Sequence, residues 1–321
     1  MCDVALLLVC HGTPTSLDEI PSFLARIRGG RPASDVVVKA VRARYEAIGG
    51  SSPLLRTTQA QAEKLSARIG CPCFVATRMG CPSVEDALRA IAQANRFREL
   101  VVVSAAPHRA RVYFDEVRNV AAKLAAQGAM LPNLHEAREW GTSQLYVRGW
   151  SNATAQILNG IGPSGASRAA VVFTAHSLPI RMIDEGDPYS ELVAETASAL
   201  TECLRNCHSP AVLLTILAYQ SQGMSNELWL GPDLTATFDH VRSVGADSVV
   251  LVPIGFPVEH LETLYDLDIE ARRMAEAHCL SFHRVPCLDA DDSVVEAMCV
   301  GVKEVASASW GVAPAIGLIS R

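Results

Sequence analysis

Two similar segments decide the fold: residues 4–14, VALLLVCHGTP, and residues 169–179, AAVVFTAHSLP. Each begins as an unbroken apolar run of strand length and ends in a turn with the pattern His-x-x-Pro. A continuous apolar run is typical of a strand that is buried on both faces of a parallel sheet. His11 and His176 therefore occupy matching positions at the ends of two strands. The repetition predicts a duplicated α/β unit.

The rest of the chain alternates between strand and helix patterns. Further β-branched runs bounded by Gly, Pro and Ser favour strands at residues 74–77, 100–104, 134–137, 211–217, 248–252 and 281–285. Stretches with helical periodicity lie between them, at residues 84–97, 114–127, 189–204 and 261–277. This alternation predicts an α/β fold of two similar Rossmann-like lobes, each a four-stranded parallel sheet flanked by helices.

The predicted lobes cover residues 1–145 and 146–321, and the terminal helix is a candidate to pack back on the first lobe. The first two strands lie further apart in the first half than in the second, which places an insertion within residues 15–53. Parallel α/β sheets bind ligands at the carboxyl ends of their strands. The cleft between the halves is therefore the predicted site.

The composition indicates a globular enzyme, because 49% of the residues are hydrophobic and 19% are charged. No apolar run approaches the roughly 18 residues of a membrane span, and the N-terminus lacks the features of a signal peptide. We therefore expect a cytoplasmic protein that is not an integral membrane protein. The net charge of -6 argues against nucleic-acid binding. The ten scattered cysteines favour reduced thiols, and their spacing disfavours an iron–sulfur cluster.

Residues 259–270 concentrate acidic side chains and contain no Lys or Arg. In a helix, Glu262, Asp266 and Glu270 are four residues apart and share one face. Like charges at this spacing repel, which leaves two interpretations open. The row is either a solvated helix face or a path for a cation or for protons. With His11 and His176 it offers the nitrogen and oxygen ligands that suit divalent Fe, Co, Ni or Zn.

The predicted insertion is basic. Residues 26–56 contain seven Lys or Arg residues and two acidic residues, in a chain with an overall charge of -6. Guanidinium groups beside a cleft bind carboxylates or phosphates with a fixed bidentate geometry. The alternative interpretation is a solvated basic helix face.

Several motifs now point to one family. The chain resembles the ferrochelatases over essentially its whole length, and the motifs that carry the resemblance are RYEAIGG at 44–50, SPL at 52–54, FTAHSLP at 173–179, GDPY at 186–189, QS at 220–221, WLGPD at 229–233, VPIGF at 252–256 and HLETLYD at 260–266. The resemblance implies a lyase-type metal chelatase that inserts Fe(II) into a porphyrin in haem biosynthesis. It also implies that porphyrin and ferrous iron are the partners of a monomeric enzyme. Iron is then a substrate, and no tightly bound cofactor is expected.

The resemblance also assigns roles to individual residues. It makes His176 and Glu262 the catalytic pair, and it implies metal contacts for these two residues and for Asp266, Glu270 and His11. The family's porphyrin-binding positions correspond to His11, Arg28, Arg44, Ser52, Ser221 and Trp229.

The subgroup follows from the insertion. The short polar segment RGGRP at residues 28–32 resembles the soluble coproporphyrin III ferrochelatases, so coproporphyrin III is favoured over protoporphyrin IX. The chain departs from that subgroup at two positions. His11 stands where a tyrosine is usual, and Gly29 where a second arginine is common. We therefore expect His11 to ligate the product iron. A cobalt or nickel tetrapyrrole chelatase and a noncatalytic haem carrier are the alternative functions.

Overall fold

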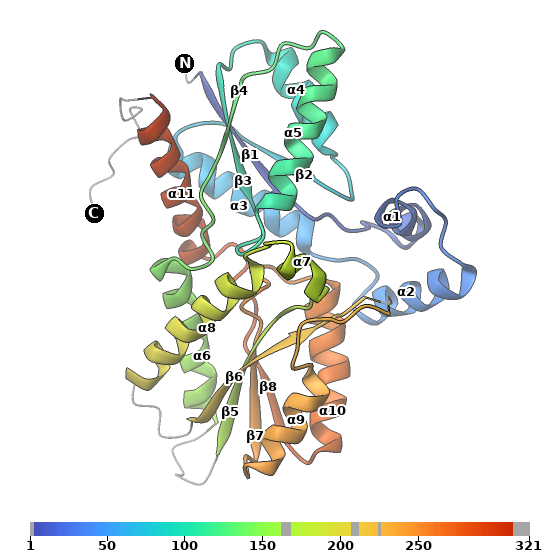
Figure 1. Cartoon of the computed structure of the whole chain (residues 1–321), viewed down its shortest axis with the longest axis vertical. Helices are drawn as coiled ribbons and strands as arrows, with labels where there is room; N and C mark the ends of the chain where they lie inside the picture. Colours follow the sequence, from blue (N-terminus) through green and yellow to red (C-terminus); the bar gives the residue numbers. More distant parts are fainter. Residues whose placement is uncertain (1–2, 162–167, 207–211, 224–225, 311–321) are drawn as a thin grey trace. The chain divides into compact units, whose positions relative to one another are not determined.

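The strands form two parallel sheets. The computed structural model describes residues 3–161, 168–206, 212–223 and 226–310, and within these residues both sheets have four strands, ordered β2-β1-β3-β4 and β6-β5-β7-β8 (Figure 1). The strands are β1 (Val4–Cys10), β2 (Cys73–Thr77), β3 (Glu99–Ser104), β4 (Asn133–Glu136), β5 (Ala169–His176), β6 (Val212–Gln220), β7 (Ser248–Val252) and β8 (Ser281–Arg284). The equal strand order confirms the predicted duplication and the predicted fold class.

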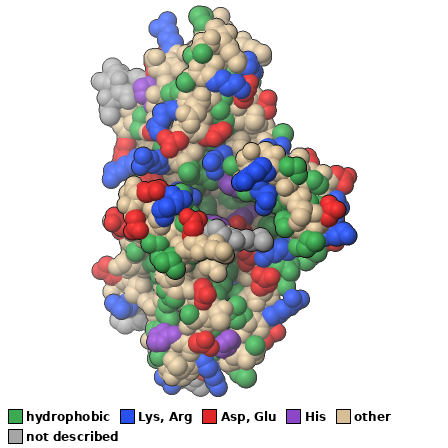
Figure 2. All heavy atoms as spheres, turned by 45° about the vertical axis from the view of Figure 1, so that its right-hand side comes forward, with side chains coloured by type: hydrophobic (Ala, Val, Ile, Leu, Met, Phe, Trp, Pro, Cys, Tyr) green, Lys and Arg blue, Asp and Glu red, His purple; other side chains and the backbone are tan. Residues whose placement is uncertain are grey.

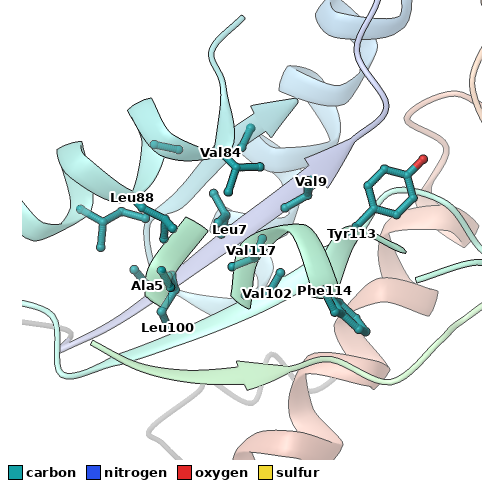
Figure 3. Close-up of a cluster of buried hydrophobic side chains, with 14 of the residues drawn as sticks. Ala5, Leu7, Val9, Val84, Leu88, Leu100, Val102, Tyr113, Phe114 and Val117 are labelled. Atoms are coloured by element: carbon teal, nitrogen blue, oxygen red, sulfur yellow. The ribbon is translucent and has the colours of Figure 1, made fainter. Parts of the chain in front are cut away.

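Helices cover both faces of the first sheet. They are α3 (Leu54–Ile69), α4 (Val84–Ala94), α5 (Arg111–Ala126) and α11 (Asp292–Trp310). The central strand β1 is buried along its whole length. Its Leu7 and Val9 pack with Val84 of α4 and Val117 of α5 (Figure 3), while α3 packs on β1 and β2 and α11 contacts β3. Burial on both faces explains why β1 reads as a continuous apolar run.

The predicted insertion forms the helices η1 (Leu17–Glu19), α1 (Ile20–Ile27) and α2 (Asp35–Ala47). Arg42 of α2 donates hydrogen bonds to the carbonyl of Leu17 at 3.1 Å and to Asp18 at 3.5 Å. Tyr45, which is buried, shares a hydrogen bond of 2.8 Å with Thr13. The Arg42 contacts thus join α2 to η1 within the insertion, and the Tyr45 bond attaches the insertion to the segment that follows β1.

The second sheet packs against α6 (Gln144–Gly160), α8 (Tyr189–Asn206), α9 (Leu234–Ser243) and α10 (Arg272–Ala277), while the short α7 (Ile180–Asp184) follows β5. Phe238 and Val241 of α9 are buried with Val249 and Leu251 of β7. The hydroxyl of Tyr146 in α6 donates to the carbonyl of Ile254 at 2.8 Å. These contacts hold the loop after β7 against α6.

The chain divides into two compact units, one of residues 1–140 with 289–321 and the other of residues 141–288. Each unit contains one of the two sheets. Helix α11 follows the second sheet in the sequence, yet its Asp292 and Glu296 form ion pairs with Lys64 and Arg68 of α3. The sequence-based boundary at residues 145 and 146 lies inside α6, whereas the compact units separate between Trp140 and Gly141.

One predicted element differs in kind. Residues 261–277 are predicted to be helical, and they form the π-helix η2 (Glu262–Ala271) followed by α10. The predicted helix is present, but the periodicity did not specify the π-type hydrogen bonding of η2. A π-helix has wider turns with i→i+5 hydrogen bonds and is rare beyond a single turn, so contacts from elsewhere must maintain it.

The surface carries interspersed charges on the face shown in Figure 2, where acidic and basic side chains alternate over short distances. This mixture does not form the continuous basic stripe that is typical of a nucleic-acid-binding surface. Among the described residues, no helix combines the length and the apolar character that a membrane span requires.

Candidate functional site

The centre of the candidate site is a pair formed by His176 and Glu262. His176 is the last residue of β5, and its Nδ1 lies 3.0 Å from Oε2 of Glu262, the first residue of η2. The two side chains are 35% and 32% exposed, so both remain within reach of a substrate. The carbonyl of His176 accepts a hydrogen bond of 2.9 Å from the hydroxyl of Tyr189. The structure thus brings the predicted catalytic pair together.

A second imidazole approaches the same carboxylate. Nε2 of His260 lies 3.8 Å from Oε2 of Glu262, and its Nδ1 lies 3.0 Å from the carbonyl of Val258. Burial alone would raise the pKa of Glu262, but the neighbouring His176 and His260 rings outweigh burial and hold this pKa well below its usual range. Glu262 is therefore a carboxylate at neutral pH.

Gln220, the last residue of β6, and Ser221, which follows it, reach Glu262 and Asp266 through a chain of hydrogen bonds. The side-chain amide of Gln220 donates to the backbone carbonyl of Glu262 and to Oγ of Ser221, at 3.3 Å in both cases. Because Oγ of Ser221 accepts the hydrogen bond from Gln220, its hydroxyl proton is available to donate a hydrogen bond to Oδ2 of Asp266. Ser221 has a positive φ of 56°, which is uncommon outside glycine. The backbone and Gln220 together direct this hydroxyl to Asp266.

The acidic row continues along η2. Asp266 is buried at 8% exposure, whereas Glu270 is exposed. Four residues span about one turn in an α-helix and in the wider π-helix. Residues four apart therefore lie near one another on one side of either helix. The row therefore runs from the His176–Glu262 pair to the surface. Among the described residues, no group of three or more His, Cys, Asp or Glu side chains is placed to hold a metal ion.

The other two acidic residues of this segment face a different partner. Arg284 at the end of β8 pairs with Asp268 and with Glu259, through contacts of 2.6 Å and 2.8 Å respectively. Burial alone would raise the pKa of Glu259, but Arg284 outweighs it and lowers this pKa. The five acidic residues thus form two sets, and only Glu262, Asp266 and Glu270 belong to the row.

Trp229 lies in the loop that leads to α9. It forms a backbone bridge with Pro179, and the flanking residues Leu228 and Leu230 bond to Ile180 and Leu178. These bonds connect the Trp229 loop to the segment immediately after His176. A Cβ atom on Gly223 would lie 2.7 Å from the Trp229 ring, so the indole packs directly on that backbone.

His11 follows β1 in the first unit and is exposed. Its carbonyl accepts a hydrogen bond of 2.7 Å from the backbone N–H of Met79. The next residue, Gly12, has φ of +86°, and a Cβ there would lie 2.7 Å from the backbone nitrogen of Gly80. Only glycine fits this turn. The tight turn fixes the point from which His11 projects.

The predicted porphyrin-binding residues of the insertion lie on successive elements. Arg28 is exposed at the end of α1, just before Gly29 and Gly30, which both have positive φ. Arg44 is half-buried in the last turn of α2. Oγ of Ser52 accepts a hydrogen bond of 3.3 Å from the backbone N–H of Leu54, at the start of α3.

Two contributors to the site have no role assigned from the sequence. Gln220 is part of the family motif QS at residues 220–221, and its position at the carboxyl end of β6, beside His176 in the sheet register, is the further signal that could have placed it in the site. Arg284 has no such local signal. It is distant in sequence from both of its carboxylate partners, and only the pairing of β8 with β7 brings it to them.

Known proteins match this chain along most of its length. The family model for ferrochelatase matches residues 3–306. The coproporphyrin III ferrochelatase of Anoxybacillus flavithermus is 30% identical, over 92% of this chain and 94% of that protein. The ferrochelatase of Thermus thermophilus is also 30% identical, over 95% of this chain and 99% of that protein.

Solved structures support the fold. SirB from Bacillus subtilis with Fe3+ matches with a TM-score of 0.58 at 15% identity, covering 97% of this chain and 98% of that chain. CbiX, the terminal enzyme of siroheme biosynthesis in denitrifying bacteria, matches with a TM-score of 0.50 at 14% identity, covering 94% and 98%. The fold, the family match over residues 3–306 and the relatives at 30% identity agree, and this chain belongs to the ferrochelatase family, whose members are metal chelatases that carry out a lyase-type reaction.

Proposed function

We propose that this chain inserts ferrous iron into coproporphyrin III, with His176 and Glu262 at the reacting centre. The observation that carries the proposal is the 3.0 Å contact between Nδ1 of His176 and the ionised Glu262. A carboxylate accepts hydrogen bonds only, so the proton of a neutral His176 lies on Nδ1. Nε2 then carries the lone pair that accepts a proton from a pyrrole nitrogen.

The acidic row supplies the second part of the reaction. Two protons leave the porphyrin for each metal ion that enters, so the site must both accept protons and deliver a cation. Glu262, Asp266 and Glu270 form a line of oxygen ligands of suitable charge from the centre to the surface. We assign them to metal delivery, to proton release or to both. Iron is the substrate in this scheme, and no tightly bound cofactor takes part.

The preference for coproporphyrin III rests on charge. Coproporphyrin carries four propionates and protoporphyrin carries two, so the former needs more cationic or hydrogen-bonding partners. Arg28, Arg44 and Ser52 on the insertion, with Ser221 and Trp229 of the second unit, are the proposed porphyrin contacts. The name of the Anoxybacillus flavithermus relative supports this choice.

His11 is proposed as the residue that ligates iron in the product complex. An exposed imidazole on a rigid turn is a suitable haem ligand. We expect the His11→Ala variant to bind product haem with a changed absorption spectrum, because a nitrogen ligand is lost. An unchanged spectrum would assign His11 to the local structure of the turn.

The function is tested by anaerobic incubation of the purified protein with Fe(II) and either coproporphyrin III or protoporphyrin IX, followed by absorption spectroscopy. We expect faster iron insertion into coproporphyrin III. Faster insertion into protoporphyrin would refute the substrate preference alone. Turnover with Co(II) or Ni(II) but not with Fe(II) would indicate a different chelatase, and tight haem binding without any insertion would indicate a haem carrier.

A further inference from the structure

Arg284 joins the two ends of the segment that carries Glu262. Its Nε and Nη2 donate to the two carboxylate oxygens of Asp268, at 2.6 Å and 2.7 Å. Its Nη1 donates to Oε1 of Glu259 at 2.8 Å. Glu259 precedes η2 by three residues and Asp268 lies within it, so Glu262 lies between the two attachment points.

The arrangement is half-buried, with Asp268 29% exposed, and its hydrogen bonds are well satisfied. The side chains of Arg284 and Glu259 are 9% and 13% exposed. Glu259 also accepts hydrogen bonds from the backbone N–H of Cys287 at 2.9 Å and from the hydroxyl of Thr263 at 2.7 Å. An ion pair that is largely shielded from water and has several hydrogen bonds favours one geometry, because separating its members leaves charges without partners.

Such an attachment has a specific consequence for η2. A π-helix of this length is rare and depends on tertiary contacts, and π-turns occur frequently at functional sites. Arg284 provides a contact of this kind, since its planar fork fixes both the distance to Asp268 and its orientation. The contact comes from β8, which is paired with the rigid centre of the second sheet.

We propose that Arg284 is a positioning residue for metal insertion, which holds η2 so that Glu262 meets His176 and Asp266 meets Ser221. This inference rests on the proposed function of the His176–Glu262 pair. Arg284 does not touch the reacting atoms. It acts on them through Glu259 and Asp268.

The test uses the full chain with three substitutions. Arg284→Lys keeps the positive charge but loses the bidentate fork, and Asp268→Asn keeps the shape but loses the partner charge. Arg272→Lys is the matched control, because exposed Arg272 bonds to the backbone carbonyl of Asp268, at 3.1 Å, and packs on the Phe282 ring, and among the described residues it forms no ion pair with Asp268 or Glu259. For each variant the melting temperature, the kcat, the porphyrin KM and the hydrogen exchange of residues 262–271 are measured.

We expect Arg284→Lys to lower kcat by about 10- to 100-fold, the range that follows a displacement of roughly 1 Å in a catalytic group. Its porphyrin KM should stay within about twofold of the wild-type value, since Arg284 bonds to Asp268, Glu259 and the Val285 carbonyl and to none of the proposed porphyrin-binding residues. Hydrogen exchange should accelerate in residues 262–271 and remain unchanged in β5 and β7. Arg272→Lys should resemble the wild type in every measurement.

Two results would overturn the proposal. One is a folded Arg284→Lys variant with wild-type kcat and wild-type exchange in η2. The other is a loss of activity that only follows the loss of folded protein, with exchange faster throughout the second unit. If Arg284→Lys does not fold, Asp268→Asn decides by the same criteria. If the wild type inserts no metal into any porphyrin, the proposed function fails, while the hydrogen exchange still tests whether Arg284 holds η2.

Discussion

At the scale of single residues, the tautomer of His176 links the geometry of the site to its chemistry. The neighbouring carboxylate of Glu262 is ionised, because the two imidazoles outweigh the effect of burial on its pKa. An ionised acceptor 3.0 Å from Nδ1 selects the tautomer with the proton on that nitrogen. When the ring is neutral, the opposite nitrogen carries the lone pair that accepts a proton, and Glu262 stabilises the positive charge that then forms on the ring.

Replacing His176 should separate binding from chemistry. We expect His176→Ala to fold and to bind porphyrin with unchanged affinity, while the rate of iron insertion falls by about 10²- to 10⁴-fold, the usual contribution of a general base. Fluorescence titration measures porphyrin binding, and anaerobic absorption assays measure the rate. His240→Ala, which alters an exposed histidine of α9, is the control and should be fully active. Near-normal turnover of His176→Ala would remove this residue from the mechanism.

At the scale of elements, η2 shows where sequence patterns stop being informative. The four-residue spacing of Glu262, Asp266 and Glu270 correctly predicted a shared helix side, because α- and π-turns both preserve that neighbourhood. It could not identify the π-helix. Two distant residues contact this helix, Arg284 of β8 at Asp268 and Gln220 at the end of β6 at the carbonyl of Glu262, and the spacing within the segment contains no information about them.

The strands were easier to predict than the site. A strand buried on both faces needs an apolar side chain at nearly every position. The residues of β1 and β5 show this pattern on their own, without information from the rest of the chain. The pair formed by His176 and Glu262 joins residues on separate elements, and their proximity depends on the packing of η2 beside β5. The family motifs indicated both residues, whereas spacing alone left Glu262 on a possible solvated face.

The insertion carries the prediction about substrate preference. We expect the double variant Arg28→Gln/Arg44→Gln to raise the KM for coproporphyrin III roughly tenfold or more, since each charge-assisted pair contributes about 1.5–3 kcal/mol. The KM for protoporphyrin IX should change less, because that substrate has fewer carboxylates. Arg26→Gln/Lys39→Gln removes the same charge from exposed positions of α1 and α2 and serves as the control. Equal losses for both porphyrins would contradict the assigned preference.

At the scale of the whole molecule, stability depends on pH through groups outside the candidate site. His278, at the end of α10, lies 2.7 Å from the carbonyl of Met274 and 3.0 Å from Asp239 of α9. The Met274 carbonyl and the Asp239 carboxylate both raise the pKa of His278. His283 on β8 behaves in the opposite way, because burial and the charge of Arg272 lower its pKa. The two histidines therefore give the folded state opposing pH dependences.

The contribution of His278 has a definite sign. A histidine whose pKa is higher in the folded state stabilises the protein fully below its unfolded pKa of about 6.5, and this contribution disappears as the pH rises through the folded value. His283 contributes equally to the stability of the wild type and of Asp239→Asn, since this substitution changes the partner of His278. The contribution of His283 therefore cancels when the two stabilities are compared. We expect the wild type to have a higher urea midpoint than Asp239→Asn at about pH 6, with the gap narrowing toward about pH 8. Circular dichroism across this range measures the gap, with exposed Asp184→Asn as the control for a lost surface charge. A gap that is constant with pH would show that Asp239 stabilises the helix pair without involving the charge of His278.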